Sequence, residues 1–247
     1  AAFVAGTAHQ LVFKAEQLQE RQEESSKLTS SGISSDVSTV LLFLIAEATA
    51  DACEAADHLR LDDEDRIRRA LIAAIRALAR GKLQSIIEAD SPDLNYLKGQ
   101  NISDVAVAAL YRQILFGIQI LARQLSGQPG EAPENAHELF LSLRDLCISE
   151  KVEVFEDGEP DEVVTFAGPF HLATLMAALS RDLLDSSVVE IEPPDGLDGA
   201  QWEESLRNVA AERPFLWRNH RQAIEEGYLQ TGTSSVVGFP TGAGKST

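Results

Sequence analysis

Cysteine and histidine are too few and too scattered in this sequence to indicate a metal or disulfide scaffold. The two cysteines, Cys53 and Cys147, lie far apart and neither belongs to a CxxC pair, so a disulfide framework and a zinc site built on paired cysteines are not expected. The five histidines show no HExxH or other paired spacing, and no GxSxG nucleophile motif occurs. Two isolated thiols are typical of a reducing compartment, so we expect a cytoplasmic location.

Long hydrophobic runs are also missing. The most apolar run extends from Val40 to Ala46 and is soon followed by Glu47 and Asp51, which is far short of the roughly 20 apolar residues that a membrane-spanning helix needs. Residues 1–20 lack the basic start and compact apolar core of a secretory signal. We therefore expect no membrane partner.

Basic residues are outnumbered by acidic ones. Thirty-nine acidic residues against 21 basic ones give a net charge of −18, so the average surface repels phosphate backbones and anionic membranes. Nucleic-acid binding would need a local basic patch or a further domain. Arg66, Arg69, Arg76 and Arg80 lie on roughly one face of a predicted helix, and they form either a phosphate-binding stripe or, as we favour in so acidic a chain, intramolecular pairs.

Helical periodicity dominates the first 150 residues. The chain of 247 residues is 44% hydrophobic, enough for one large or two small domains with a buried core. Apolar residues recur at helical spacing, as Ile67, Leu71, Ile75 and Leu78 do. The acidic run Asp62 to Asp65 is interpreted as a helix cap. The predicted helices are Phe3–Lys27, Asp36–Leu59, Asp62–Ala89 and Ser103–Leu125, which form a mainly α bundle.

The sequence pattern changes from helical to β-like after Ser149. Two β-rich runs, 151–155 and 162–166, flank an acidic turn and predict a hairpin. They are followed by a predicted helix at 170–184, a strand at 187–191, a helix with Trp202 and Leu206, a helix near 219–230 and a strand at 234–237. We expect a helical accessory domain at 1–130, a small α+β insert at 131–192, and a third unit that starts near residue 200 and extends to 247.

The last residues carry a phosphate-binding motif. Gly242 and Gly244 let the backbone curl round an anion so that its N–H groups point inward. Lys245 can reach the β and γ phosphates, and Ser246 can coordinate Mg²⁺. We therefore predict that ATP and Mg²⁺ are cofactors, with Lys245 as the catalytic residue and Ser246 as the metal ligand. The predicted nucleotide-binding residues of this loop are Thr241, Gly242, Ala243, Gly244, Lys245, Ser246 and Thr247.

The string Pro240 to Thr247 resembles motif I of superfamily 2 helicases, in the Pro-Thr-Gly-x-Gly-Lys form of DEAD/DEAH-box and Ski2-like members. The usual small residue at the first position of the loop is replaced by Phe239. The segment 214–224 is similar to the aromatic and Gln lead-in that recognises adenine in these enzymes. Aligning its Ala-Ile pair places His220 at the adenine-reading position, whereas matching by residue type selects Gln222. The resemblance covers about 35 residues and implies that residues 200–247 start a RecA-like α/β P-loop domain.

The resemblance implies an N-terminal part of an ATP-dependent helicase or translocase. Such an enzyme couples ATP hydrolysis to movement on nucleic acid, which it would contact through motor domains beyond this sequence. If the chain is the helical N-terminal region of a large helicase, it also resembles the helicase subunits of prokaryotic antiphage defence systems such as Hachiman. Because the sequence lacks the other motor motifs, we expect the chain to be an incomplete piece that does not hydrolyse ATP by itself.

Two alternatives stay open. The first 200 residues are acidic, rich in Ala and poor in aromatic stacking platforms, which suits a helical module that docks a protein partner within a multi-subunit complex. A P-loop NTPase that is not a helicase is the third reading, and Pro240 and Thr241 argue against it.

Overall fold

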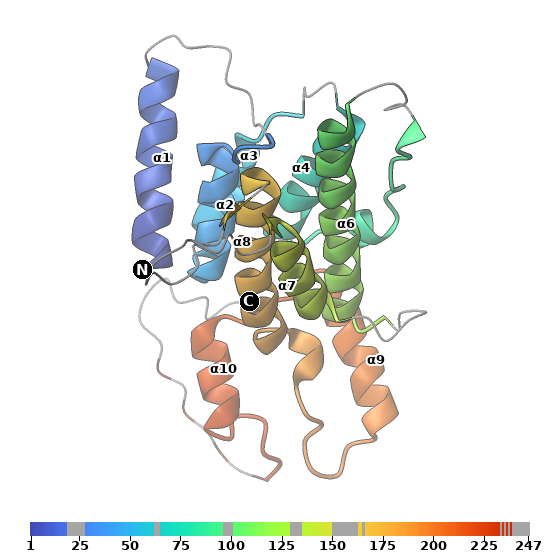
Figure 1. Ribbon diagram of the computed structural model, residues 1–247. Helices are drawn as coiled ribbons and strands as arrows, with labels where there is room; N and C mark the ends of the chain where they lie inside the picture. The colour runs from blue at the N-terminus through green and yellow to red at the C-terminus, as the bar shows by residue number, and fades with distance from the viewer. Residues whose placement is uncertain are drawn as a thin grey trace, which may run out of the picture.

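The computed structural model describes residues 1–18, 28–61, 65–95, 101–128, 135–149, 163–164 and 166–232, together with 234, 236 and 238. These residues are mainly helical, as predicted, and the helices run side by side as a bundle with a smaller lobe at one end (Figure 1). The helices are α1 (Ala2–Leu18), α2 (Ser35–Ile45), α3 (Thr49–Asp57), α4 (Arg66–Ala79), α5 (Leu83–Ile87), α6 (Ile102–Leu125), α7 (Ala136–Leu146), α8 (Ala167–Asp185), α9 (Gly199–Ala210) and α10 (Arg218–Glu225).

Side-chain caps fix where four of these helices begin. The Asp65 carboxylate accepts hydrogen bonds from the backbone N–H groups of Ile67 and Arg68 at 2.8 and 3.1 Å, which confirms this residue of the acidic run as the cap of α4. Asn101 caps α6, Asn135 caps α7 and Asp198 caps α9 in the same way. In each case one of the N–H groups that lack a partner inside the helix is satisfied by the chain itself.

Two of the predicted helices are broken by left-handed residues. The expected helix 36–59 divides into α2 and α3 at Glu47, which has a φ of 56°. The expected helix 62–89 divides into α4 and α5 at Gly81, which has a φ of 66°. At both breaks the backbone N–H of the next residue donates to a carbonyl five residues earlier, so each helix ends in a Schellman motif.

One hydrophobic core joins the helices from α2 to α8. Tyr111 of α6 lies fully buried in it and donates from its hydroxyl to the backbone oxygen of Thr29 at 2.6 Å. Phe140 of α7 packs against Gly117 of α6 so closely that a Cβ at Gly117 would lie 2.6 Å from the ring. The predicted boundary near residue 130 therefore does not separate two cores, because α7 and α8 belong to the same core as the preceding helices.

The β-structure is smaller than predicted. Ile148–Ser149 (β1) pairs antiparallel with Val163–Val164 (β2); β2 lies within the second predicted strand, whereas the first one, 151–155, falls outside the described residues. The predicted strand at 187–191 is wrong. Val188–Glu190 forms a 3₁₀ helix there, and only Ser187 makes a bridge, to Phe215. Ser234 and Val236, from the last predicted strand, have no regular structure.

The C-terminal lobe has a small core of its own. Val188, Leu206 and Ala210 are buried together there, with Trp202 packed against them. The Trp202 indole nitrogen donates to the backbone oxygen of Ile191 at 2.8 Å. The lobe thus holds α9 against the segment that leaves α8.

Helix α6 is the only described helix that is long and apolar enough to cross a membrane. Its apolar residues pack against α4, α5, α7 and α8, and most of them are buried. The central position of α6 in the bundle therefore explains why it is so apolar, since a helix surrounded by other helices is apolar on most sides.

Candidate nucleotide-binding site

The phosphate-binding loop lies outside the described residues. This holds for Thr241, Gly242, Ala243, Gly244, Lys245, Ser246 and Thr247, and for Phe239 and Pro240 before them. The part of the predicted site that the structure describes is the segment 214–230, which contains both candidates for adenine recognition, His220 and Gln222.

The start of this segment is anchored to the end of the bundle. The backbone N–H of Val188 donates to the oxygen of Pro214 at 3.0 Å, and that of Leu216 donates to Ser186 at 2.7 Å. The ring of Pro214 lies against Gly81, where an added Cβ would come within 3.2 Å. Phe215 packs on the main core. The position of α10 is therefore set by the turns at the ends of α4 and α8.

The two adenine candidates have different surroundings on α10. The rings of His220 and Trp217 are stacked, with centroids 6.0 Å apart and 25° between their planes. Gln222 is exposed and donates from its amide nitrogen to Glu226 at 2.8 Å. Residues two apart on a helix point about 200° apart. Gln222 therefore points away from the Trp217–His220 stack.

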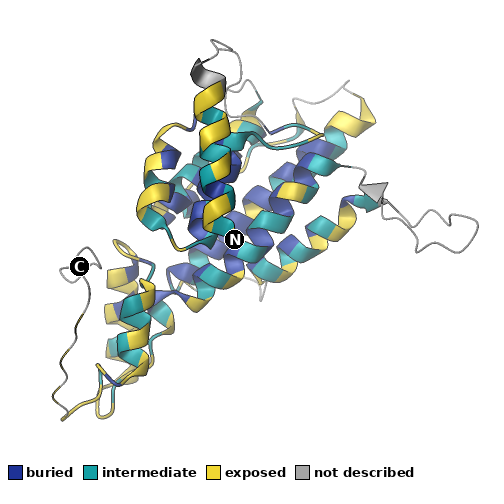
Figure 2. Cartoon of the chain, turned by 90° about the vertical axis from the view of Figure 1, so that its left-hand side faces the viewer, coloured by how far each residue is buried: buried dark blue, intermediate teal, exposed yellow. Residues whose placement is uncertain are grey.

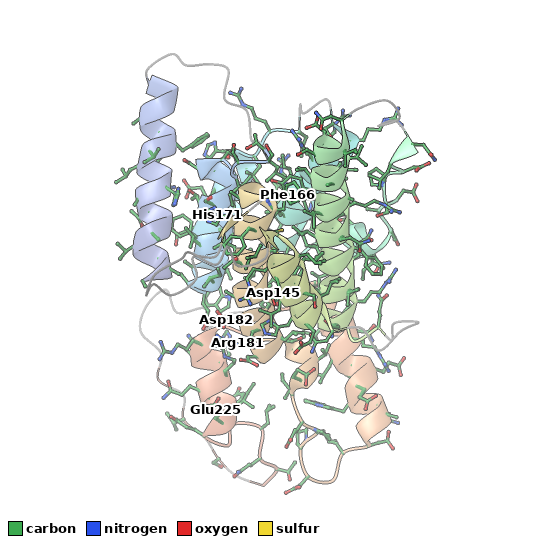
Figure 3. The ribbon with its side chains drawn as sticks, in the orientation of Figure 1. Asp145, Phe166, His171, Arg181, Asp182 and Glu225 are labelled. Carbon is green, nitrogen blue, oxygen red and sulfur yellow. The ribbon has the colours of Figure 1, made fainter. Side chains whose placement is uncertain are left out.

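An ion pair holds α10 to the bundle. One guanidinium nitrogen of Arg221 donates to both carboxylate oxygens of Glu47, at 2.8 and 2.9 Å. Asp182 of α8 lies close to this pair, at the junction between α8 and α10 (Figure 3). Burial raises the pKa of Asp182, and the carboxylates of Asp185 and Glu47 add to that rise while Arg181 and Arg221 oppose it. Arg221 of α10 thus pairs with Glu47 at a junction that also holds Asp182.

The cavities in the described part of the chain are small. One of about 20 Å³ lies at the junction, between Glu47, Asp182 and Trp217, and a second of about 60 Å³ lies between α1 and the helices α2 and α3. The first has room for about one water molecule. Across the residues with described positions, no group of three or more His, Cys, Asp or Glu side chains could hold a metal ion. The described residues alone therefore complete neither a nucleotide site nor a metal site.

The arginine stripe on α4 is partly paired. Of its four residues, Arg80 contacts Asp57 of α3, and Arg68, a neighbour outside the predicted stripe, lies 3.9 Å from Asp65. Arg76 is half-buried, and its Nε has no hydrogen-bond acceptor. The contact of Arg80 agrees with intramolecular pairing, while for Arg66, Arg69 and Arg76 the choice between pairing and phosphate binding stays a prediction.

Sequence reasoning missed the Glu47–Arg221 pair. The two residues are 174 positions apart, and Glu47 sits in a break where no glycine or proline signals the end of a helix. No periodicity links such residues, so only the folded chain brings them together.

Comparisons with protein-family models, with curated proteins and with solved structures found no match to this chain. Its function is therefore inferred from its own residues.

Proposed function

We propose that this chain is the N-terminal part of an ATP-dependent superfamily 2 helicase or translocase. The observation that carries the proposal is the sequence Pro-Thr-Gly-Ala-Gly-Lys-Ser-Thr at 240–247, preceded within 30 residues by an aromatic and polar helix. Binding of ATP with Mg²⁺ by residues 241–247 is the activity that we assign to this chain. Its location would be cytoplasmic.

The donor set of the loop fits a magnesium nucleotide. Inward backbone N–H groups at Gly242 to Gly244 suit phosphate oxygens, and the Lys245 ammonium adds a point charge at the β and γ phosphates. The Ser246 hydroxyl is a hard oxygen ligand of the kind that Mg²⁺ prefers. When bound, Mg²⁺ neutralises the charge that develops on the phosphates, while the residues of this chain hold and orient the nucleotide.

The stack of Trp217 and His220 supports a base-binding role for α10. The two rings offer aromatic faces on which a base could stack, and each His220 ring nitrogen can donate or accept one hydrogen bond according to its protonation. Gln222 could make both bonds of the adenine edge, but its side chain points away from the Trp217–His220 stack. We therefore assign adenine recognition to His220 and keep Gln222 as the alternative.

Hydrolysis and movement would need parts that this sequence lacks. The acidic pair that positions metal and water, and the arginines of a second RecA-like domain, have no counterpart in these 247 residues. Nucleic acid would be contacted by those motor domains, since the chain itself has a net charge of −18.

The decisive experiment is a titration with Mg-ATP. The chain has two tryptophans, and Trp202 is bound to Ile191 in the C-terminal lobe, so a Trp202→Phe background makes Trp217 the only emitter. We expect Mg-ATP to quench this emission saturably. Lys245→Ala should weaken binding at least tenfold, whereas Lys82→Ala, at an exposed lysine before α5, should leave it unchanged. Equal affinity in the Lys245→Ala variant contradicts the proposal.

The same titration decides between the two adenine candidates. His220→Ala should reduce the preference for ATP over GTP, with little effect of Gln222→Ala. The reverse result selects Gln222, and an unchanged ratio in both variants removes α10 from base recognition.

A helical protein-interaction module is the second candidate function. It is favoured by the exposed apolar residues of α1, of which Val4 and Leu11 are 72% and 62% exposed. Absence of nucleotide binding by the chain, together with capture of a partner through α1, would select it. A P-loop NTPase that is not a helicase would bind Mg-ATP but show no stimulation by nucleic acid when joined to its motor domains.

A further inference from the structure

The outward face of α1 is an apolar stripe. Val4, Ala8, Leu11 and Ala15 are all exposed and follow one another at intervals of four, three and four residues, which places them along one side of the helix. Figure 2 looks directly onto α1, and its exposed residues face the viewer. Within the described ranges, α1 packs mainly against α2, so the stripe points away from the bundle.

The inward face of α1 is already engaged. Gly6 is buried, and a Cβ there would lie 2.9 Å from the ring of Phe43. Phe13 contacts His58 with ring centroids 6.3 Å apart. A rotation of α1 that buried Val4 and Leu11 in the bundle would break the contacts of Gly6 and Phe13 with the bundle. The stripe therefore cannot be covered by its own bundle.

The spacing of the stripe matches a helix–helix seam. Intervals of four, three and four residues are those of the a and d positions of a coiled coil, and large residues alternate with small ones. The pattern is symmetric about the midpoint between His9 and Gln10. When a second α1 is laid against the first in the opposite direction, Val4 faces Ala15 of the other copy and Ala8 faces its Leu11.

We propose that a second copy of this chain docks on α1, with the two α1 helices antiparallel about a two-fold axis near residues 9 and 10. Every large residue then meets a small one across the axis, which lets the helices approach closely. Such an interface uses the same surface of both copies, the commonest arrangement in homodimers.

Charge favours a second copy at this surface. Residues 1–15 contain no Asp or Glu, although the chain has 39 acidic residues and a net charge of −18. Two copies that meet through α1 therefore approach where their repulsion is weakest. Lys14 is the only Lys or Arg in residues 1–15. The antiparallel arrangement separates the two Lys14 residues by about 13 Å along the axis.

The size of the stripe predicts a reversible dimer. Four side chains from each copy form a contact smaller than the roughly 800 Å² per partner of a standard interface. We expect dissociation in the micromolar range. This inference does not depend on the nucleotide-binding proposal, since that proposal uses residues of α10 and of 241–247 and none of the α1 stripe.

Sedimentation velocity between about 1 and 100 µM tests the dimer. The wild-type chain should shift towards twice its mass of 26.8 kDa as concentration rises. The Val4→Asp/Leu11→Asp variant should dissociate about 100-fold more readily, because two apolar contacts per copy are replaced by charges. Ile102→Asp/Leu146→Asp is the matched control, since both residues are exposed and apolar but lie on α6 and α7.

Cross-linking tests the antiparallel arrangement. In a Cys53→Ser background, chains carrying Ala8→Cys and chains carrying Leu11→Cys should form a mixed disulfide in preference to either symmetric one. A dominant Leu11→Cys homodimer would contradict the two-fold axis that we infer. A wild-type chain that stays monomeric at 100 µM, or an unchanged dimer in the Val4→Asp/Leu11→Asp variant, overturns the proposal. Circular dichroism monitors the fold, and Val4→Ser/Leu11→Ser replaces the charged variant if its helix content falls.

Discussion

Replacement of Arg221 by alanine should loosen α10 without unfolding the bundle. The Arg221–Glu47 pair is the charged contact between α10 and the α2–α3 turn, with both distances below 3.0 Å. Exposed ion pairs contribute about 0.2–1 kcal/mol. Since the Arg221 side chain is 22% and that of Glu47 39% exposed, we expect a value near the upper end, about 1 kcal/mol. Loss of the pair should therefore raise the open population of α10 about fivefold.

Amide hydrogen exchange measures this opening directly. In the Arg221→Ala variant, peptides from α10 should exchange about fivefold faster, whereas peptides from α2 and α6 should be unaffected. Arg218→Ala is the control, because Arg218 is exposed at the first position of the same helix. Glu47→Gln should reproduce the effect of Arg221→Ala. Equal exchange in the Arg218→Ala and Arg221→Ala variants would refute the idea that the ion pair holds α10 in place.

Three further predictions concern stability and binding. Gly168→Ala should lower the free energy of unfolding by about 3 kcal/mol in a denaturant titration, because the added Cβ would clash with the backbone oxygen of Thr29 and lie 2.6 Å from the Tyr111 hydroxyl. An unchanged free energy of unfolding would show that the segment around Thr29 moves aside at no cost. Burial lowers the pKa of His171, and nearby His9 adds to the effect. As the pH falls, His171 is therefore protonated in the unfolded chain before it is protonated in the folded chain. The free energy of unfolding should be independent of His171 above about pH 6.5 and should decrease below that pH. His171→Asn should flatten that fall in thermal unfolding curves, and an unchanged pH dependence would exclude this residue as its source. Fluorescence anisotropy with DNA at about 150 mM salt should detect negligible binding by the chain, and submicromolar, salt-sensitive affinity would instead identify the 66–80 stripe as a phosphate-binding track.

Strong local signals in the sequence predicted much of the bundle. The predicted helix 103–125 differs from α6 by one residue at its start, because a long apolar pattern begins after an Asn cap. The spacing of Ile67, Leu71, Ile75 and Leu78 correctly identified the buried face of α4. These features depend on residues close in sequence, which is the range over which periodicity and capping act.

The observed structure differs from the predicted one where tertiary contacts override the local preference of the sequence. The break at Glu47 has no glycine or asparagine to indicate a left-handed residue. Residues 187–191 are rich in Val and Ile, yet they form a 3₁₀ helix because Val188 is buried with Leu206 and bonded to Pro214. The apolar outer face of α1 could not be assigned either, since periodicity does not tell which side of an apolar helix meets the bundle. The phosphate-binding loop itself stays a prediction.

The capping side chains have a consequence for how this chain can be altered. Asp65, Asn101 and Asn135 each start a helix from the residue directly before it, so the helix start does not depend on the segment that precedes the cap. Exposed positions outside helices, such as Asn135, are preferred sites for inserted tags or fluorophores. A reporter peptide inserted just before Asn135 should therefore leave α7 in place, which offers a handle for immobilising the chain while α1 and α10 remain accessible.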